Sequence, residues 1–219
     1  MNNHNHKRSL RSDMPRRTKQ ESEQTRSALL AKALELYADR GIEHVSLKEI
    51  AAQAGVTHGA VYWHFKNRDD LLFQIYHQIE LPFEIQYIEQ RQSAKQNPLQ
   101  ALQDYLMGVI HLVTTSTSVQ QGYRLFFTLP ASPALASMAE RLLEDREMVT
   151  SHLRYFLKQA KKHKLLQKKL SVILSAQSLS LVLFGLLDQS LVESDPKQYK
   201  AQAHNLIHIV MQGMAAEKA

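Results

Sequence analysis

Apolar residues recur with a helical period along almost the whole chain, and no segment shows the sustained alternation of a half-buried strand. The first clear stripe falls at i, i+3, i+4 and i+7 and consists of Leu30, Ala33, Leu34 and Tyr37. Gly41 follows this stripe, at a position where glycine commonly ends a helix in the left-handed conformation. The pattern therefore predicts an all-α protein.

Two short helices are predicted after the first one. Ser46 and Glu49 have the spacing of a capping box, in which the hydroxyl accepts the Glu49 amide and the carboxylate reaches back. Gly55 permits a sharp turn, and Thr57 is expected to cap a third helix that runs to about residue 64. We expect Val56 to fill the space between the two helices, and small side chains to let them cross closely; these are Ala51, Ala52 and Ala54. This arrangement predicts a helix-turn-helix, whose second helix enters the major groove of DNA.

The predicted helices lengthen beyond residue 67. Asn67, followed by two aspartates, is expected to cap a fourth helix that reaches about residue 81, where Pro82 kinks or ends it. Further helices are predicted at 98–113, 133–162, 169–192 and 196–214. We therefore expect a basic N-terminal arm at 1–19, a three-helix domain at 20–67 and a larger helical domain at 68–219.

Composition narrows the class of protein. Apolar residues make up 44% of the 219 residues, which excludes a disordered chain, and the absence of cysteine excludes disulfides, thiolate zinc sites and iron–sulfur clusters. The longest apolar stretch, 178–187, is shorter than the roughly 20 residues of a transmembrane helix, and the first 15 residues contain no apolar run typical of a signal peptide. We therefore expect a cytoplasmic protein without a membrane partner.

No catalytic motif occurs in 68–219: neither a P-loop, a glycine-rich dinucleotide fingerprint, an HExxH zinc motif nor a nucleophile elbow. We therefore expect no enzyme activity and no cofactor. His204 and His208 have a spacing that metals use, but no third ligand is evident, and we predict an interface role rather than a metal site. His4 and His6 are interpreted in the same way.

The net charge of +6 is concentrated near the N-terminus. Six Lys and Arg residues lie in 1–19 beside a single acid, Asp13, whereas the rest of the chain has 21 basic and 20 acidic residues. Such an arm indicates a polyanion, either nucleic acid or an anionic membrane, unless it is a solvated tail without function. The helix-turn-helix pattern favours nucleic acid. Five lysines in 161–169 are interpreted as a solvated helix end rather than a binding patch.

Residues 25–72 resemble, without a gap, the DNA-binding domain of the TetR family of bacterial repressors. The segment includes the distinctive string GAVYWHFK at 59–66, and within the family it is most similar to the AcrR-like branch of multidrug-efflux repressors. The rest of the chain is similar to the family only in length and helical character. The resemblance implies a DNA-binding domain followed by a ligand-binding and dimerisation domain.

The resemblance implies DNA-binding roles at particular positions. These are Arg26, Ser46, Leu47, Thr57, His58, Gly59, Tyr62, Trp63, His64 and Lys66. Thr57 and Tyr62 are expected at phosphates or base edges, and Lys66 is expected at a phosphate. Ser46 and Leu47 begin the helix that crosses the DNA backbone, and Arg26 is expected near a phosphate at the start of the first helix.

His58 departs from the family branch, which usually has Arg or Lys at this position. A neutral histidine cannot make the bidentate guanine contact of an arginine, so either the target sequence differs or a partly protonated His58 contacts a phosphate. Val61 and Phe65, and less strongly Trp63, are expected to support the fold. His64 either contacts a phosphate or lies at the seam between the domains.

In the family, the last two helices of each chain pair with those of a second chain, which implies a homodimer here through 169–214. Apolar residues on most sides of 169–192 need more burial than one small domain offers, although burial within the monomer would serve some of them. The apolar residues of 169–192 that need this burial are Leu174, Leu179, Leu181, Val182, Phe184, Leu186, Leu187 and Leu191.

The family's effector pocket lies among the helices of about 80–185. Aromatic or polar residues on otherwise apolar helices are the candidates here: Tyr105, His111, Phe126, Phe127, Gln177, Phe184 and Asp188. The Asp188 carboxylate either meets a cationic compound, caps a helix or pairs with a lysine, because a buried carboxylate without a partner is costly.

We therefore expect a homodimeric repressor that binds double-stranded operator DNA, is released from a palindromic operator by a small apolar or cationic effector, and controls an efflux or transport gene. The alternative is a non-sensory DNA-binding protein whose C-terminal region only dimerises. A cavity lined by aromatic and a few polar groups would favour the first, and a fully packed core the second.

Deletion of residues 2–19 is expected to weaken binding to DNA of any sequence and to flatten its salt dependence, because Lys and Arg contacts to phosphate release counterions without reading bases. If all six cations contacted phosphate, the slope of log affinity against log salt would fall by roughly five, and for partial engagement we expect about two. Binding titrations at several salt concentrations measure this slope. An unchanged slope would show that the arm is a passive tail.

Overall fold

The computed structural model describes residues 19–79, 81–128 and 133–216, so the basic arm lies outside the described residues except for Lys19. The described residues form helices and no β-strand, apart from one antiparallel bridge between Leu166 and Ala215, and the all-α prediction is confirmed. The α-helices are α1 (Lys19–Arg40), α2 (Leu47–Gln53), α3 (His58–His64), α4 (Arg68–Gln78), α5 (Pro82–Gln90), α6 (Pro98–Thr115), α7 (Thr117–Phe127), α8 (Ala139–Lys162), α9 (Val172–Ser190) and α10 (Pro196–Met214). Three 3-10 helices are η1 (Ile42–His44), η2 (Ser93–Lys95) and η3 (Pro133–Met138).

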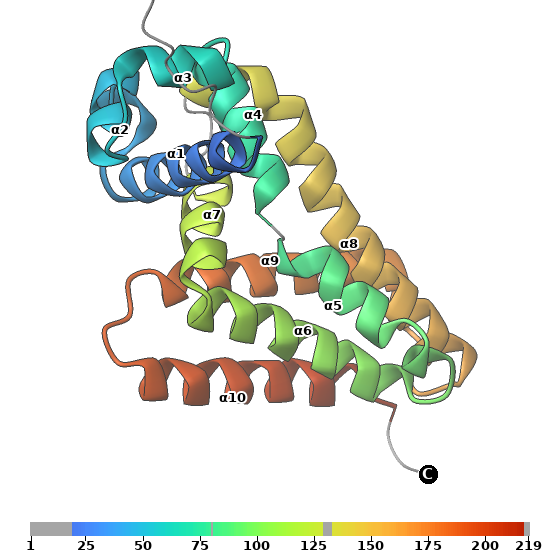
Figure 1. Cartoon of the computed structure of the whole chain (residues 1–219). Coiled ribbons are helices and arrows are strands. Elements are labelled where there is room, and N and C mark those ends of the chain that lie inside the picture. The colour runs from blue at the N-terminus through green and yellow to red at the C-terminus, as the bar shows by residue number, and fades with distance from the viewer. Residues whose placement is uncertain (1–18, 80, 129–132, 217–219) are drawn as a thin grey trace, which may run out of the picture.

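The helix-turn-helix is assembled on α1, which α2 and α4 contact (Figure 1). All four residues of the predicted stripe on α1 are buried: Leu30, Ala33, Leu34 and Tyr37. Burial raises the pKa of Tyr37 to about 12, against the lowering influence of the nearby Arg68 guanidinium. Gly41 ends the helix as predicted, since its φ of 85° lies in the left-handed region and its amide donates to the Tyr37 carbonyl at 2.9 Å.

The turn between α2 and α3 depends on Gly55, whose φ of 70° would strain a residue with a Cβ atom. The Val56 amide donates to the Ala51 carbonyl at 2.9 Å and closes this turn. The expectation that three alanines line the helix crossing is correct only in part. Ala51 is buried and Ala54 half-buried, but Ala52 is exposed, because successive residues of a helix point about 100° apart.

Prolines begin helices here instead of bending them. The Asn67 side chain caps α4 as predicted, accepting the Asp70 amide at 2.8 Å, but the helix ends at Gln78 rather than near residue 81. Pro82 then opens α5, since a proline is well placed in a first turn and keeps the residue before it, Leu81, in extended conformation. Pro133 likewise begins the 3-10 helix η3, and α8 starts at Ala139 rather than at the predicted residue 133.

The larger domain is built around α6, which contacts α5, α7, α8, α9 and α10 (Figure 1). The predicted stripe on α6 is buried throughout and comprises Leu102, Tyr105, Leu106, Val109, Ile110 and Val113. Gly108 allows α5 to approach closely, because a Cβ at this position would lie 1.8 Å from Oε1 of the buried Gln86. The long helix α8 packs along α9 and extends from the DNA-binding domain to the far end of the molecule.

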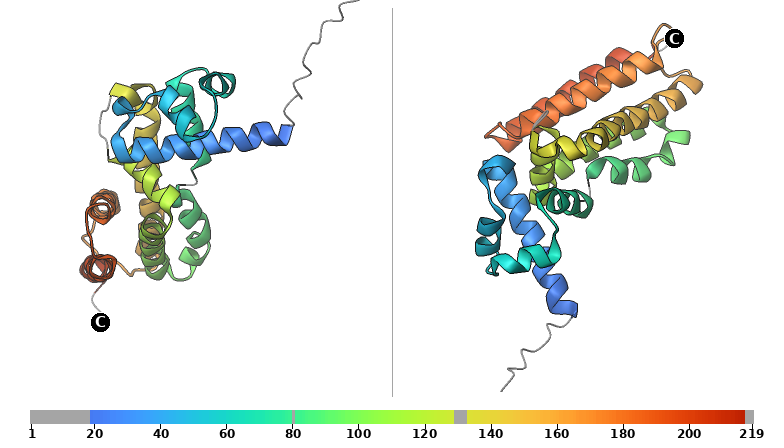
Figure 2. Two further views of the ribbon diagram at one scale, coloured as in Figure 1. Left: turned by 60° about the vertical axis from the view of Figure 1, so that its left-hand side comes forward. Right: turned by 90° about the horizontal axis from the view of Figure 1, so that it is seen from above.

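The pair α9 and α10 forms an outer layer on one side of the larger domain (Figure 2). By length and composition alone, α9 is apolar enough to cross a membrane. Of its most apolar 18-residue stretch, 39% is buried inside the protein. Four residues predicted at the dimer interface pack instead inside the monomer, on the side of α9 that faces the core: Leu179, Phe184, Leu186 and Leu187. The opposite side of α9 leaves apolar residues exposed, as do α10 and the turn between the two helices; these are Ile173, Leu174, Leu181, Val192, Leu206 and Ile209.

Candidate nucleic-acid interface and effector region

The solvent-facing side of α3 carries large aromatic side chains. Tyr62 is 54% exposed and Trp63 is 73% exposed, although aromatic residues of this size usually gain stability from burial. Val61 and Phe65 are buried, which confirms their expected role in supporting the fold, whereas Trp63 takes no part in the core. The His58 ring contacts the edge of Tyr62, with centroids 5.0 Å apart. Together these side chains form an exposed surface suited to contact bases and phosphates.

The N-terminal end of α3 is equally open. Thr57, His58 and Gly59 are exposed, and Thr57 occupies the N-cap position as predicted. The Thr57 side chain makes no capping hydrogen bond, contrary to expectation. His64 is half-buried, and its ring lies edge-on to Trp63 with centroids 4.7 Å apart.

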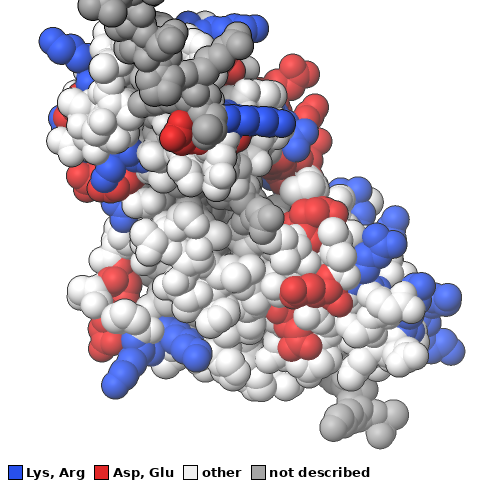
Figure 3. Space-filling model, viewed as in Figure 1, with Lys and Arg blue, Asp and Glu red and all other residues white. Residues whose placement is uncertain are grey.

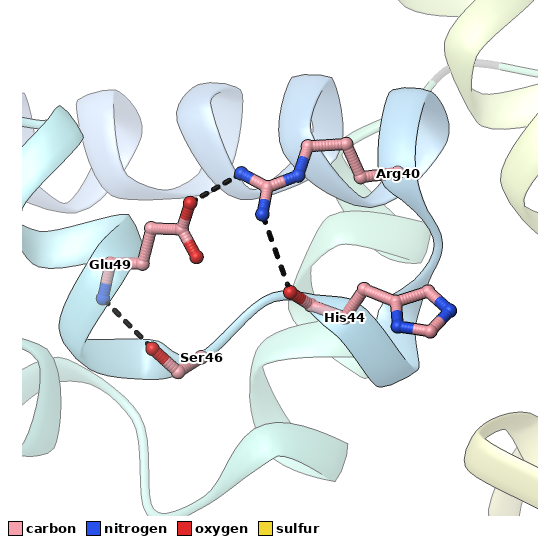
Figure 4. A network of polar contacts seen from close by, with 4 residues as sticks. All are labelled: Arg40, His44, Ser46 and Glu49. Carbon is pink, nitrogen blue, oxygen red and sulfur yellow. Dashed lines mark hydrogen bonds and ion pairs between the residues drawn. The ribbon is translucent and has the colours of Figure 1, made fainter.

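The start of α2 is held by the polar network in Figure 4. The Ser46 hydroxyl accepts the Glu49 amide at 3.2 Å, which confirms one half of the capping box. The Glu49 carboxylate does not complete the box but forms an ion pair with Arg40 at the end of α1, because a guanidinium offers a stronger, charge-assisted bond than an amide. Arg40 also donates to the His44 carbonyl, and the network thereby fixes α2 against α1 while Ser46 stays exposed and Leu47 is half-buried.

The two predicted phosphate-binding cations have different surroundings. Lys66 is exposed just before α4, and its backbone amide donates to the Asp70 carboxylate at 2.9 Å. Arg26 was expected at the start of the first helix, but α1 begins at Lys19, which places Arg26 in its second turn. Its side chain is half-buried there. Its guanidinium lies 5.9 Å from the Phe65 ring and donates to Gln74 at 2.5 Å. Arg26 therefore joins α1 to α4 within the fold.

Basic side chains also gather at the end of the molecule opposite α3, around the end of α8 (Figure 3). Lys161 has a structural role there, because its Nζ donates to the carbonyls of Lys168 and Leu170 at 2.9 and 3.0 Å and closes the turn before α9. Lys162 and Lys164 are exposed beside it. These contacts agree with the interpretation of 161–169 as a helix end.

Helix α4, which packs on α1, is bonded to α8 through a buried carboxylate. Asp145 is only 2% exposed and accepts a hydrogen bond from the Tyr76 hydroxyl on α4 at 2.5 Å. Arg141, one turn earlier on α8, donates to the same hydroxyl at 3.0 Å and lies 3.5 Å from the carboxylate. Burial and the bonded carboxylate raise the pKa of Tyr76, so its hydroxyl remains a donor. The sequence pattern did not point to these three residues, because 65 or more positions separate Tyr76 on α4 from its partners on α8.

Three of the seven predicted effector residues lie in one aromatic cluster where α7 meets α9. The cluster comprises Phe127, Phe184 and Asp188 together with Phe83 and Tyr123. A fourth, Phe126, contacts the Tyr76 ring of α4. Asp188 accepts the Tyr123 hydroxyl at 2.7 Å, so it is bonded within the protein. Arg146, which no sequence motif indicated, lies 4.4 Å from the centre of the Phe184 ring and donates to the Phe127 carbonyl at 2.7 Å. The cluster thus already holds a cation.

Tyr105 belongs to a second polar group in the core, centred on the buried His152 of α8. The Tyr105 hydroxyl lies 3.4 Å from Nδ1 of His152, whose ring stacks on Tyr87 at 4.0 Å and whose Nε2 lies 3.2 Å from the Glu84 carboxylate. Burial lowers the pKa of His152, and Glu84 opposes this shift. The structure does not bring the other two predicted residues to either cluster, because His111 and Gln177 are exposed on α6 and α9.

His204 and His208 are both exposed, one turn apart on α10. Across 19–79, 81–128 and 133–216 no group of three ligating side chains is placed to hold a metal. His4 and His6 lie outside the described residues.

Residues 29–75 match the family model described as bacterial regulatory proteins, tetR family. BepR, a transcriptional repressor of Brucella suis biovar 1, is 30% identical over 179 residues, which cover 80% of this chain and 84% of BepR. The regulator AcrR of Shigella flexneri is 39% identical over 102 residues, about half of either chain. The crystal structure of NalD, the secondary repressor of the MexAB-OprM multidrug efflux pump in Pseudomonas aeruginosa, is 27% identical, covers 91% of this chain and all of that chain, and gives a TM-score of 0.75.

The fold and the exposed surface of α3 define a helix-turn-helix DNA-binding protein. The similarity to BepR along most of both chains identifies its family. The chain belongs to the TetR family of bacterial regulatory proteins and is a DNA-binding transcriptional regulator.

Replacing Tyr62 or Lys66 by Ala is expected to weaken DNA binding at least about tenfold, because each change removes a phosphate or base contact from an exposed position. Thermal unfolding followed by circular dichroism is expected to be nearly unchanged, since neither side chain is in the core. Lys162→Ala, at the far end of α8, is the matched control and is expected to bind DNA normally. Equal weakening by all three variants would contradict a specific role for α3.

Proposed function

We propose that this protein is a cytoplasmic, homodimeric repressor of an efflux or transport gene, released from a palindromic operator by a small molecule. The single observation that carries the DNA-binding part is the exposure of Tyr62 and Trp63 on a short helix whose other side is buried. The efflux target rests on the relatives: AcrR and BepR are named as transcriptional regulators, and NalD as a repressor of an efflux pump.

The proposed DNA contacts combine positioning and readout. His58, Tyr62 and Trp63 of α3 face the major groove, while Lys66 and the exposed N-terminal end of α2 at Ser46 contact the flanking phosphates. Arg26 acts indirectly in this proposal, because it holds α4 against α1 through Gln74. A palindromic operator requires two copies of α3 about 34 Å apart, which one chain cannot supply.

The proposed dimer is formed by the exposed sides of α9 and α10. Their uncovered apolar residues follow helical spacing, as Leu174 and Leu181 do along α9. Gly185 and Gly213 lie on the same helices, and a Cβ atom at either position would meet no heavy atom within 4 Å, so another backbone can approach closely there. A two-fold axis through this surface pairs the helices of two chains as a four-helix bundle.

The proposed effector acts near the aromatic cluster of α7 and α9. Phe126, the α7 residue just before Phe127 of this cluster, contacts the Tyr76 ring with centroids 5.5 Å apart, and Tyr76 is the residue through which α4 is bonded to Asp145. A compound that displaces these rings therefore changes the position of α4 and with it the spacing of the two α3 helices. Arg146 on the Phe184 face disfavours a cationic compound, and we propose an apolar effector without positive charge.

Leu181→Lys is expected to convert the dimer into a monomer, because it places a charge in the middle of the proposed interface while leaving the monomer core intact. Sedimentation at micromolar concentration measures the association. The matched control is Leu143→Lys on α8, a leucine 64% exposed against 76% for Leu181, and this variant is expected to remain dimeric. A wild-type protein that sediments as a monomer would rule out the dimer.

Titration of the DNA-bound protein with dyes, bile acids, antibiotics and phenolics tests the effector. We expect at least one uncharged apolar compound to weaken binding to the promoter of the neighbouring gene by about 5–150-fold, the usual range of allosteric coupling. In Tyr76→Phe, which keeps the ring but loses the bond to Asp145, the same compound is expected to bind with a smaller effect on DNA. Compounds that bind without changing DNA affinity would favour the non-sensory alternative.

A further inference from the structure

A groove of about 420 Å³ lies where the DNA-binding domain meets the larger domain. Its walls come from α1, the last turns of α4, α5 and the adjoining ends of α6 and α7. The volume is within the range of about 300–1,000 Å³ that is usual for small-molecule sites. None of the seven predicted effector residues lines it, and no residue of the aromatic cluster around Phe184 belongs to its lining.

The lining of the groove is chemically simple. Apolar side chains dominate, including Ile75 and Ile79 of α4 and Leu112 of α6, and the polar residues are Gln78, Ser116 and Ser118. No lysine, arginine, aspartate, glutamate or histidine belongs to this lining. A charged compound would lose hydration there without gaining a partner, whereas a neutral one with a single polar group would keep a hydrogen bond to an amide or a hydroxyl.

The groove lies beside the contact that sets the position of α4. Ile79, directly after α4, packs against Gly122 of α7 so closely that a Cβ at Gly122 would lie 2.7 Å from its Cδ1 atom. The same Ile79 side chain lines the groove. A molecule that enters the groove therefore presses on the residue by which α4 rests on α7.

We propose that this groove is a second small-molecule site, which takes an uncharged, largely apolar compound with one hydrogen-bonding group and displaces the end of α4. The binding part is independent of the function proposed above. The consequence for DNA rests on that function, because it requires that the spacing of α3 controls affinity.

The binding part can be tested with 1-anilinonaphthalene, a neutral apolar fluorophore with one N–H group. We expect it to bind the full-length protein saturably, and the same skeleton carrying a sulfonate, 1-anilinonaphthalene-8-sulfonate, to bind at least about tenfold more weakly. Ala31→Phe fills the groove from an exposed position on α1 and is expected to raise the dissociation constant of the neutral probe at least about tenfold. Ser118→Tyr fills it independently from α7, and is expected to do the same.

Ala28→Phe is the matched control, since Ala28 is exposed on the same helix but does not line the groove, and it is expected to change probe affinity less than about twofold. Circular dichroism checks that each variant is folded. Absence of saturable binding, unchanged binding in both filled variants that fold, or tighter binding of the sulfonate would each overturn the site.

The neutral probe is then titrated into the protein bound to its promoter DNA. We expect it to weaken DNA binding in the wild type and in Ala28→Phe but not in Ala31→Phe, within the range of about 5–150-fold for allosteric coupling. Probe binding without any effect on DNA affinity would overturn the effector role of the groove. Failure of the protein to bind the DNA at all would instead contradict the proposed function and leave the binding result for the groove intact.

Discussion

The position of α4, which packs on α1, depends on one buried carboxylate. Asp145 sits inside the protein, where an ionised group without partners would cost several kcal/mol, and its bonds to Tyr76 and Arg141 offset part of that cost. Because Tyr76 lies near the end of α4, these bonds tie α4, and through it α1, to the long helix α8. Any rearrangement of α4 must break the bond, carry the carboxylate along or provide a substitute donor, and the position of α3 is therefore discrete rather than freely variable.

A second contact completes the attachment and gives α4 a defined direction. Ile79 rests on Gly122, while Tyr76 contacts Phe126 one turn further along α7, so two successive turns of α7 meet two residues of α4 and its end. Since α1 also packs on α7, this helix joins the helix-turn-helix to the larger domain at more than one point. The aromatic cluster adjoins α7 on the side of α9, and the groove adjoins it on the side of α1, so both proposed sites border the same helix.

The sequence predicted local features well and long-range ones poorly, for a physical reason. Helix periodicity, the Asn67 cap and the glycine at the end of α1 are set by neighbouring residues, and the structure confirms them. The partner of Glu49 proved to be Arg40 rather than the backbone of Ser46, and Asp145 and Arg146 gave no recognisable signal, because their partners are distant in the chain. Of the candidate effector residues, His111 and Gln177 face solvent, since a polar residue on an apolar helix marks the outer face as readily as a pocket. The DNA-binding positions came from resemblance, and they stay predictions: of those on α3, His58, Gly59, Tyr62 and Trp63 are exposed, whereas His64 is half-buried.

The exposed Trp63 gives this molecule a built-in optical reporter. It is the only tryptophan in the sequence, so tryptophan emission comes solely from the surface of α3 and from none of the core. Its indole is in water in the free protein and would be shielded or stacked when a duplex covers that helix, which alters both the colour and the yield of its light. Occupancy of the nucleic-acid surface can therefore be followed in the unlabelled, unmodified chain, without interference from events elsewhere in the protein.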